Sequence, residues 1–521
     1  MPSSRRRVIV VGSGAAGMAA AVAAAAGGAS VSVLEAAATL GGTTAISGGG
    51  AWFPANRWAA RAGVEDSLSQ ALSYLASLGI GACPDHARTF VQDSGRVAGL
   101  IGEQTPLRWS HLLGRPDYHP ELDGGSAGGR SVEVHPFEAG TELISLVRSD
   151  PYDAPPVTLV ESESTNPPDE VEIDRRRRSG IVARGRGLIA GLYAALLEMG
   201  GAVETRARVT RLVRRGAAVV GVEVGGSELR GQVVLASGGF ERNAALVSAF
   251  LRGPMLAPGG PPTNVGDGVR LGAAVGVSLA NMSEAWWVAA THIPGETIDG
   301  APFYRMLFSE SPQPGGLVVD GRGRRFANEA VSYYSFGRTL HERNEDTMRY
   351  DRASSWLIFD ARRRADGGIG PLRGTDPDPT WLRSSATFAD LARGIDVDPA
   401  ALVATVERFN ADAASGEDRE FGRGSFAWDR LRHKTGTLRS LTEPPFFAMQ
   451  IIPGCSGTNG GVRTDDLGRA LRAADDGVIP GLFAAGNAAA YPFGPRYPGP
   501  GATIGPAIVF GWRAGEAAAR Q

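Results

Sequence analysis

Three glycines near the start of the chain are spaced as in a turn that holds a phosphate group. The run Gly12–Gly17 reads Gly-Ser-Gly-Ala-Ala-Gly and directly follows the valine-rich segment Val8–Val11. In such a turn the first glycine permits the tight bend, the second lets the backbone approach a pyrophosphate, and the third lets helix and strand pack closely. The N-terminus of the following helix attracts negative charge through its free N–H groups and its dipole. The run therefore predicts a dinucleotide-binding turn.

The residues after this turn complete the pattern. The alanine-rich segment 15–26 predicts a helix, and 30–34 reads as a second strand that ends at Glu35. A carboxylate at that place accepts hydrogen bonds from ribose hydroxyls. NAD and FAD fit this first part equally well.

Three further glycine-rich segments favour FAD. The first, Gly41–Gly50, contains the clusters Gly41–Ala45 and Ser47–Gly50, which can wrap a second nucleotide half and a flat ring. The other two, Leu235–Phe240 and Gly481–Asn487, each read as a strand that enters a turn. Because the segment 41–50 contains neither His nor Cys, we expect the FAD to be bound without a covalent link. The residues expected to contact it are Gly12, Gly14, Ala15, Ala16, Gly17, Glu35, Gly42, Thr43, Thr44, Ser47, Gly48, Gly49, Ser237, Gly238, Gly239, Gly486 and Asn487.

The elements that must position these residues belong to separated parts of the chain. Segments from about 7 to 56, 180 to 276 and 446 to 521 look like one nucleotide-binding domain, with a helix at 188–198 and strands at 219–224 and 233–235. The block between them is richer in aromatic and charged residues. We therefore predict an α/β fold: a Rossmann-like FAD-binding domain (1–276 and 443–521) with an inserted α+β substrate domain (277–442). The segment 158–178, which ends in four arginines, is interpreted as a surface loop.

Composition excludes several other classes of protein. The net charge of the 521 residues is −2, which gives no reason to expect a nucleic acid as partner. The two cysteines, Cys83 and Cys455, form no metal, haem or disulfide pattern, so we expect no metal. No secretory signal precedes Val8, and the segment 15–26 is too short to cross a bilayer. We expect a cytoplasmic protein without a transmembrane segment and leave peripheral membrane contact open.

Three motifs carry a resemblance to a known family. They are Tyr497–Ala507 (Tyr-Pro-Gly-Pro-Gly-Ala-Thr-Ile-Gly-Pro-Ala), Gly323–Glu329 with Tyr333 downstream, and Asp117–Glu121 followed by Gly128–Arg130 and Pro136-Phe137. With them the chain resembles the fumarate-reductase and 3-ketosteroid-dehydrogenase flavoproteins from Val8 to Ala518, and within that group the 3-ketosteroid Δ1-dehydrogenases. The Tyr-Pro-Gly-Pro-Gly run is the most specific of the three.

The resemblance implies a role for four residues. The hydroxyl of Tyr497 and the backbone N–H of Gly501 polarise the ketone of the substrate. Tyr333 removes the proton from carbon 2, Tyr118 assists it, and the hydride of carbon 1 goes to the flavin. Because an ordinary tyrosine has a pKa near ~10, a tyrosine base needs such a neighbour. We also place Val209, Asp267, Ala502 and Ile504 among the cofactor-binding residues.

The chain departs from the family in one of these motifs. The family usually has Asn-Glu-Ser-x-Pro-Tyr, whereas residues 328–333 read Asn-Glu-Ala-Val-Ser-Tyr. Tyr334 follows Tyr333 directly, so either of the two is a candidate base. Tyr118 can equally be an ordinary loop aromatic.

Other functions remain open on the sequence alone. A fumarate-reductase-like enzyme would use Arg496 and histidines, of which His292 and His341 are candidates. A Δ4-dehydrogenase, an enzyme for a smaller cyclic ketone and a flavin protein without turnover are further alternatives. An apolar cyclic-ketone substrate requires an apolar cleft, and the residues that would line it, or alternatively fill a core, are Trp286, Trp287, Phe303, Tyr304 and Phe308. Without haem or iron–sulfur motifs, electrons must leave to an external acceptor.

Overall fold

The computed structural model describes residues 6–80, 85–152, 154–308, 310–311, 313–433 and 436–521. The chain divides into two compact units. Unit 1 consists of Met1–Phe250, Gly260–Glu284 and Gly457–Gln521, and unit 2 of Leu251–Gly259 and Ala285–Ser456. The main part of unit 2, Ala285–Ser456, begins and ends later in the chain than the expected bounds at 277 and 442, and the short segment Leu251–Gly259 lies before those bounds. The reason is that Leu279–Ala280 (β14) pairs with Gly461–Val462 (β21) of unit 1, whereas the strand that ends near residue 456 pairs within unit 2.

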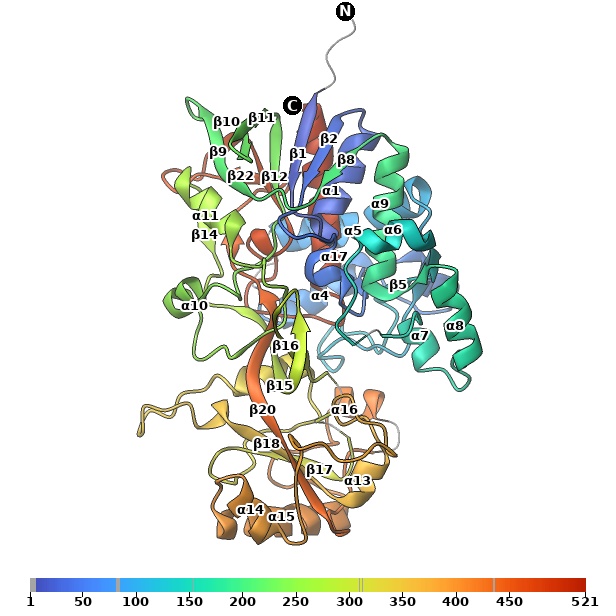
Figure 1. Cartoon of the computed structure of the whole chain (residues 1–521), viewed down its shortest axis with the longest axis vertical. Coiled ribbons are helices and arrows are strands. Elements are labelled where there is room, and N and C mark those ends of the chain that lie inside the picture. The colour runs from blue at the N-terminus through green and yellow to red at the C-terminus, as the bar shows by residue number, and fades with distance from the viewer. Residues whose placement is uncertain (1–5, 81–84, 153, 309, 312, 434–435) are drawn as a thin grey trace, which may run out of the picture. The chain divides into compact units, whose positions relative to one another are not determined.

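The main sheet of unit 1 has six strands in the order β22-β23-β12-β1-β2-β8. All neighbours run parallel except β22 and β23. In this order the strands span Arg469–Leu471, Val478–Ala484, Gln232–Leu235, Arg7–Val11, Ser30–Leu34 and Ala202–Glu204. Strands from three distant parts of the chain therefore build one sheet, as the sequence predicted (Figure 1).

Two helices pack against each other beside this sheet, α1 (Ala15–Ala26) and α17 (Ile504–Arg520) (Figure 1). A Cβ added at Gly511 would lie 2.3 Å from the carbonyl oxygen of Ala16, and one at Gly515 would lie 2.1 Å from that of Ala20. Small residues on both helices allow this approach. The C-terminal helix is thereby held against the glycine-rich turn that begins α1.

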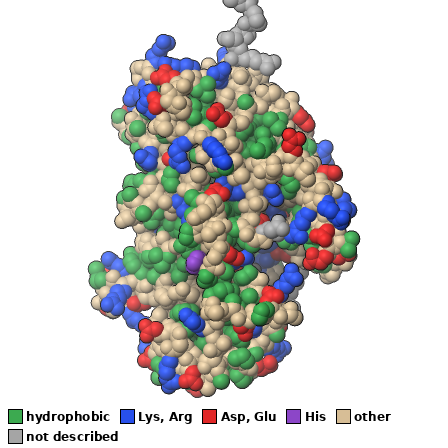
Figure 2. All heavy atoms as spheres, in the orientation of Figure 1, with side chains coloured by type: hydrophobic (Ala, Val, Ile, Leu, Met, Phe, Trp, Pro, Cys, Tyr) green, Lys and Arg blue, Asp and Glu red, His purple; other side chains and the backbone are tan. Residues whose placement is uncertain are grey.

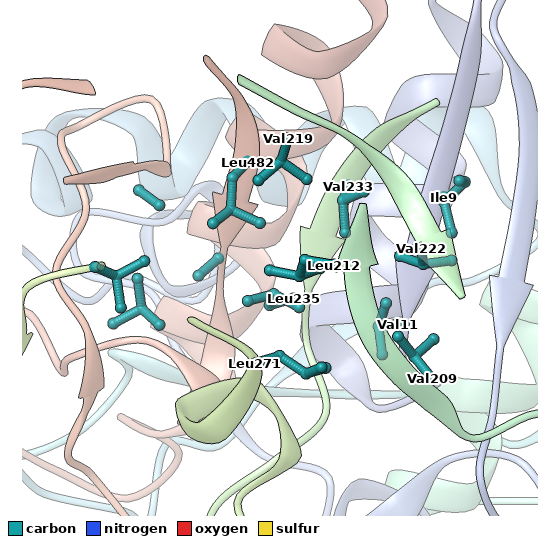
Figure 3. Close-up of a cluster of buried hydrophobic side chains, with 14 of the residues drawn as sticks. Ile9, Val11, Val209, Leu212, Val219, Val222, Val233, Leu235, Leu271 and Leu482 are labelled. Atoms are coloured by element: carbon teal, nitrogen blue, oxygen red, sulfur yellow. The ribbon is translucent and has the colours of Figure 1, made fainter. Parts of the chain in front are cut away.

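A hydrophobic cluster joins the main sheet to a three-stranded antiparallel sheet, β11-β10-β9 (Ser227–Arg230, Ala218–Val224, Val209–Arg215). Figure 3 shows its side chains between strands β1, β12 and β23 and this smaller sheet, with Leu271 from helix α11 (Asp267–Ala274). The cluster packs around the ends of the strands from which the turns expected to bind the cofactor emerge.

Shorter elements complete unit 1. A second small sheet has the order β3-β5-β4 (Ala51–Trp52, Ser131–Val134, Trp109–His111), and β6 (Phe137–Glu138) pairs with β7 (Ile181–Val182). The remaining helices are α2 (Gly42–Ala45), α3 (Arg57–Arg61), α4 (Leu68–Ser77), α5 (Asp85–Gln104), α6 (Gly140–Leu146), α7 (Leu159–Ser162), α8 (Glu170–Arg178), α9 (Arg184–Glu198), α10 (Ala244–Phe250) and the 3₁₀ turn η2 (Gly486–Ala488).

The segment 158–178 corrects one interpretation. It was expected to be a surface loop, but it contains the helices α7 and α8. Asp169 caps α8 by accepting a hydrogen bond from Glu172 N, and the Glu172 carboxylate pairs with Arg175 and Arg176. Capping and side-chain pairs three and four residues apart stabilise a helix that buries no side chain.

Unit 2 is built on a seven-stranded sheet. Its central path is β16-β15-β20-β18-β17, and both β13 and β19 pair with β20. The strands span Ala257–Pro258 (β13), Ala285–Ile298 (β15), Ala301–Met306 (β16), Gly316–Val319 (β17), Ser355–Phe359 (β18), Arg383–Ser385 (β19) and Phe446–Thr458 (β20). The helices are α12 (Tyr333–Thr339), α13 (Ala361–Ala365), α14 (Phe388–Gly394), α15 (Pro399–Ser415) and α16 (Ala427–Arg432), with the 3₁₀ turn η1 (Asp351–Ala353).

The surface carries charges of both signs. On the face shown in Figure 2, basic and acidic side chains are interspersed with hydrophobic ones. Among the described residues, no helix combines the length and the apolar character that a bilayer crossing requires. Cys455 is buried as a free thiol, and Cys83 lies outside the described residues.

Candidate active site

The glycine-rich turn of unit 1 has the geometry that the sequence predicted. Gly12 has a φ of +104°, and a Cβ there would lie 2.4 Å from the Ala236 carbonyl oxygen. A Cβ at Gly17 would lie 2.0 Å from the Gly12 carbonyl oxygen. The first and third glycines are therefore required by the packing of the protein itself.

The second glycine is different. A Cβ on Gly14 would meet nothing closer than Thr44 Oγ1 at 3.7 Å, and φ is −69°, which any residue adopts. Within the described part of the chain, the N–H groups of Ala16 and Gly17 at the start of α1 find no acceptor, and Gly14 provides no side-chain cap. Open space beside unsatisfied N–H groups is what a phosphate requires, so these residues fit the pyrophosphate of FAD.

Glu35 lies at the end of β2 and is only 7% exposed. Its Oε2 accepts hydrogen bonds from Ser13 N (3.1 Å) and Ser13 Oγ (2.6 Å), and its Oε1 accepts one from Ala37 N (2.8 Å). The carboxylate thus holds the glycine-rich turn in addition to the ribose contact expected for it.

The second cluster of expected cofactor residues lies on α2 and the turn after it. Thr44 Oγ1 accepts the hydrogen bond of Ala15 N (3.1 Å), so it occupies the first free donor of α1. Thr43 Oγ1 accepts from Asn264 (3.0 Å), and Ser47 Oγ donates to the Thr44 carbonyl (2.7 Å). Gly42 has a φ of +50° with no atom near its missing Cβ.

Gly48 and Gly49 continue the turn after α2. Gly48 is exposed. A Cβ on Gly49 would collide with the backbone of Arg184 and Gly185. The turn is therefore fixed against the start of α9.

The turns after β12 and β23 lie at the same end of the sheet as the glycine-rich turn after β1, because the three strands run parallel. Ser237 Oγ accepts from Gly268 N (2.9 Å), and the missing side chain of Gly239 makes room for Thr458 and Glu241. A Cβ on Gly486 would lie 2.8 Å from Ala16 Cβ.

The remaining expected cofactor residues are distributed over the same unit. Gly238 has a φ of +78° and faces Asn264, and Asn487 lies in η2. The Val209 side chain is in the hydrophobic cluster, and Asp267 pairs with Arg208. Ala502 is buried beside the start of α17, where Ile504 is the first residue.

The loop Tyr497–Gly501 is held through its carbonyl groups. Pro498 O accepts from Tyr118 N (3.0 Å) and from the Tyr74 hydroxyl (2.6 Å). Pro500 O accepts from Ser131 Oγ (2.6 Å), and Gly501 O accepts from Trp52 N (3.1 Å) and Gly505 N (2.9 Å). The donors come from α4, from the Tyr118 loop, from the small sheet β3-β5-β4 and from α17.

Gly501 combines two properties that suit an oxyanion donor. Its φ is +85°, and a Cβ would lie 2.6 Å from the Gly50 carbonyl oxygen, so only glycine fits. Its carbonyl takes two hydrogen bonds, whereas its N–H meets no acceptor among the described residues. A fixed, unsatisfied N–H can stabilise negative charge that develops on a ligand oxygen.

Tyr118 and Tyr497 lie together in unit 1. Their rings meet edge to face, with centroids 5.3 Å apart, and they are 2% and 7% exposed. Tyr118 is therefore not a surface aromatic. Thr503 Oγ1 donates to the Tyr497 hydroxyl (3.0 Å). Sequence reasoning missed Thr503, although it stands between Ala502 and Ile504 in the same motif.

In unit 2, Tyr333 is the first residue of α12, which Ser332 caps. Tyr333 is partly exposed and packs edge to face on Phe308 (4.8 Å). Tyr334 is 5% exposed, and Arg338 lies over its ring. A Cβ on Gly337 would lie 2.5 Å from Val288 N, so α12 rests directly on β15. Of the two neighbouring tyrosines, Tyr333 is therefore the more exposed.

A buried charge cluster precedes α12. Arg325 donates two hydrogen bonds to the Glu329 carboxylate (2.8 and 2.9 Å) and two to the Asp418 carboxylate (2.9 Å each). Arg423 also pairs with Glu329 (3.3 Å). Burial alone would raise the pKa values of Glu329 and Asp418, but the neighbouring guanidinium groups outweigh it and lower both. The sequence motif contained Arg325 and Glu329 without revealing this cluster.

Most of the aromatic residues considered for an apolar cleft are part of the core of unit 2. Trp286, Trp287 and Phe303 are 1%, 0% and 7% exposed. Phe308 is 51% exposed, and Tyr304 is partly exposed. Phe308, which contacts Tyr333, is the strongest candidate for a substrate-facing aromatic.

Two of the residues that a dicarboxylate site would use, Arg496 and His341, contact backbone carbonyl groups. Arg496 is exposed and donates to the Leu78 carbonyl (2.7 Å). Burial lowers the pKa of His341 to about 4, so it is neutral at pH 7, and its Nδ1 contacts the Gly337 carbonyl (3.0 Å). His292 is exposed beside Tyr304.

Comparison with known proteins shows which family the chain is similar to. The family described as "FAD binding domain" matches residues 7–504. A 4-oxocyclohexanecarboxylate 2-dehydrogenase of Sinomonas cyclohexanicum is 36% identical over 92% of this chain and 86% of its own length, and a 3-oxosteroid 1-dehydrogenase of Mycobacterium tuberculosis is 34% identical over 90% of each. The crystal structure of a 3-ketosteroid Δ1-dehydrogenase from Sterolibacterium denitrificans, in complex with 1,4-androstadiene-3,17-dione, superimposes with a TM-score of 0.90 at 32% identity, covering 99% of this chain and 100% of that one.

Proposed function

This chain belongs to the FAD-binding flavoproteins and, within them, to the 3-ketosteroid Δ1-dehydrogenase family, and on that premise we propose that it desaturates a cyclic ketone next to the carbonyl group. The protein is an FAD-dependent oxidoreductase. The substrate class proposed first is a 3-ketosteroid, which would lose two hydrogens from carbons 1 and 2.

The loop Tyr497–Gly501 is the observation that carries this proposal. It offers the Gly501 N–H and the Tyr497 hydroxyl from one short segment whose carbonyl groups are held by neighbouring elements. Thr503 donates to the Tyr497 oxygen, and a hydroxyl that accepts a hydrogen bond becomes a stronger donor. Two preorganised donors suit a ketone oxygen that gains charge as an enolate forms.

The proposed reaction divides the work among the chain's own residues. Tyr497 and Gly501 polarise the ketone, which makes the hydrogens on carbon 2 more acidic. Tyr333 removes one of the hydrogens on carbon 2 as a proton, and Tyr118 assists Tyr333 in this step. FAD, when bound, supplies the acceptor for the hydride of carbon 1. The electron pair of the broken C2–H bond then forms the double bond between carbons 1 and 2, and an external acceptor finally takes up the two electrons.

A smaller cyclic ketone is the second candidate substrate. The specific observation is the relative of 36% identity that bears the name 4-oxocyclohexanecarboxylate 2-dehydrogenase. The chemistry next to the carbonyl would be the same, so both candidates predict the same roles for Tyr497, Gly501 and Tyr333. The two candidate substrates differ in the part of the molecule away from the ketone, and therefore in the residues that would bind that part.

Anaerobic reduction of the flavin tests the proposal. The yellow holoprotein is mixed with 4-androstene-3,17-dione or with 4-oxocyclohexanecarboxylate, and the loss of oxidised-flavin absorbance is followed in a stopped-flow instrument. A product lighter by two hydrogens, with its double bond located by NMR, identifies the substrate and the position of attack. Tyr497→Phe should slow the reduction about 10²–10³-fold, as the loss of one oxyanion donor does.

Two results would contradict the proposal. If neither ketone bleaches the flavin and fumarate reoxidises the chemically reduced protein, the enzyme is fumarate-reductase-like. If Tyr497→Phe reduces at the wild-type rate, the ketone is held by other donors.

A further inference from the structure

The Tyr74 hydroxyl joins two loops that are far apart in the sequence. It donates to the Pro498 carbonyl (2.6 Å) and accepts from His119 N (3.2 Å). Tyr118 N donates to the same Pro498 carbonyl (3.0 Å). One buried oxygen on α4 therefore connects the N–H of the residue after Tyr118 to the carbonyl of the residue after Tyr497.

Tyr74 is well suited to hold these loops in place. Its side chain is fully buried. Burial, together with the negative charge of Asp117, raises its pKa well above the ordinary value, so the hydroxyl keeps its proton and remains a donor. A hydroxyl has one proton and can also accept, and both functions are used here.

The helix that carries Tyr74 is itself tied to the Tyr118 loop. Arg130 pairs with Asp66, just before α4, and with Asp117, just before Tyr118 (2.6 Å each). Its guanidinium lies over the Tyr74 ring, 5.5 Å from the centroid. Asp117 Oδ1 also accepts from Trp52 Nε1 (2.8 Å). A shift of either loop would therefore stretch buried ion pairs as well as hydrogen bonds.

We propose that Tyr74 is a positioning residue of the ketone site: through Pro498 and His119 it sets the orientation of the Tyr497–Gly501 donors relative to Tyr118. This rests on the proposed function, because it assigns Tyr74 no contact with substrate. Displacement of a catalytic group by about 1 Å can cost about 10²-fold in rate. Tyr74→Phe leaves Pro498 O with Tyr118 N alone, and the expected loss in kcat is about 10-fold to 10²-fold, with KM changed less than about threefold.

The test compares Tyr74→Phe with a matched control. Tyr193→Phe removes the hydroxyl of another buried tyrosine of unit 1 that takes part in none of these contacts. Holoproteins are compared by kcat and KM, by thermal melting and by flavin content. The infrared band of the C3 carbonyl of bound 1,4-androstadiene-3,17-dione reports on the two donors directly, because hydrogen bonds lower the stretching frequency of a carbonyl group. Tyr74→Phe should show a smaller downshift than the wild type and the control.

Hydrogen exchange adds a readout that needs no substrate. The amides of 115–120 and 495–503 should exchange faster in Tyr74→Phe than in Tyr193→Phe. If the wild type acts on no cyclic ketone, the proposed function fails, and this exchange still decides whether Tyr74 holds the two loops. Unchanged exchange overturns the positioning role, and so does a wild-type kcat together with a wild-type carbonyl band.

A second variant covers a Tyr74→Phe protein that does not fold. Ser131→Ala removes the donor to Pro500 O in the same loop. It should lower kcat and the carbonyl downshift in the same direction. If it leaves both at the wild-type values, the loop does not depend on its carbonyl partners, and the proposal is overturned.

Discussion

Unit 1 and unit 2 each contain candidate catalytic tyrosines and a buried arginine that pairs with carboxylates, but the surroundings of the two arginines differ. In unit 1, Arg130 binds Asp66 and Asp117, and the Tyr497–Gly501 loop is fixed by neutral donors to its carbonyl groups. In unit 2, Arg325 binds Glu329 and Asp418, with Arg423 as a second cation.

The charge balance of the two clusters differs. Arg130 faces two carboxylates alone, and burial raises the pKa of Asp117 to about 6 despite the guanidinium. In unit 2, two cations meet Glu329 and Asp418, and the pKa values of both carboxyls are lowered. In the first cluster two buried carboxylates share one cation, so a proton can relieve the excess negative charge. In the second, the two buried carboxylates face two cations, and the third carboxylate near Arg325, Glu420 at 3.7 Å, is exposed.

This difference matches the proposed division of labour. Unit 1 would supply the two hydrogen-bond donors to the ketone, and their strength depends on where the loop backbone lies. Several hydrogen bonds to the carbonyl groups of the loop hold that backbone in place. Unit 2 would supply the base from a short helix, α12, which the close contact at Gly337 holds against the sheet, and the buried ion pairs fix the segment before this helix.

Tyr333→Phe should have the largest effect, because it removes the proposed base and leaves the donors of unit 1 in place. Exchange of the carbon-2 hydrogen with deuterated water, followed by NMR on a 3-ketosteroid, should slow about 10²–10⁴-fold, as the loss of a general base does. Tyr334→Phe is the matched control and should exchange normally, since Tyr334 is buried beneath Arg338. The reverse pattern would move the base to Tyr334.

Arg325→Leu should destabilise unit 2 next most strongly. It leaves Glu329 and Asp418 without their shared partner in a buried site, which costs about 3–5 kcal/mol of unfolding free energy. Urea unfolding measures this, and limited proteolysis should place the new cuts within residues 285–456. Arg322→Leu is the control: Arg322 pairs with Asp351 at the surface, and such pairs contribute about 0–1 kcal/mol. Equal losses in both variants would show that the buried cluster adds nothing.

Parts of the FAD-binding fold could be predicted from the sequence because their signals are local. The first strand, α1 and β2 lie where the glycine pattern and the apolar runs placed them. The α/β fold from separated segments is confirmed. For α8 the periodic apolar signal was absent, because all its residues except Val171 and Ile173 are charged. The cap at Asp169, followed three residues later by Glu172, was the available signal.

The partners of the candidate site could not be found in this way. Tyr74 acts on Pro498, and Arg325 on Asp418, across long stretches of chain. Such contacts depend on how α4 and the C-terminal loop pack, which no local spacing encodes. The motif resemblance named the tyrosines and Gly501, whose roles remain predictions, but not the residues that hold them.

The pH dependence of stability should have opposite signs in the two clusters. The pKa of Asp117 is raised from 3.8 to about 6 in the folded protein, so between these values the folded state binds a proton that the unfolded state has lost. Its contribution to stability is present at low pH and is lost as the pH rises toward about 6. Glu329 has a lowered pKa, so its contribution is present above the unfolded value of 4.5 and is lost on acidification.

Asp117→Asn and Glu329→Gln separate the pH-dependent contributions of the two carboxyl groups to the free energy of unfolding. The change expected for Asp117→Asn is smaller than the effects of Tyr333→Phe and Arg325→Leu. Melting curves are recorded from pH 4 to 7 at constant ionic strength, and each variant is compared with the wild type at the same pH. The variant-minus-wild-type stability should rise with pH for Asp117→Asn, by up to about 3 kcal/mol at about 1.4 kcal/mol per pKa unit. For Glu329→Gln it should fall as the pH rises, because the wild type regains its ionised, paired carboxylate. Asp174→Asn, at an exposed position of α8, should run parallel to the wild type. Parallel curves for Asp117→Asn as well would mean that Arg130 keeps Asp117 ionised throughout, and the charge difference between the two clusters would disappear.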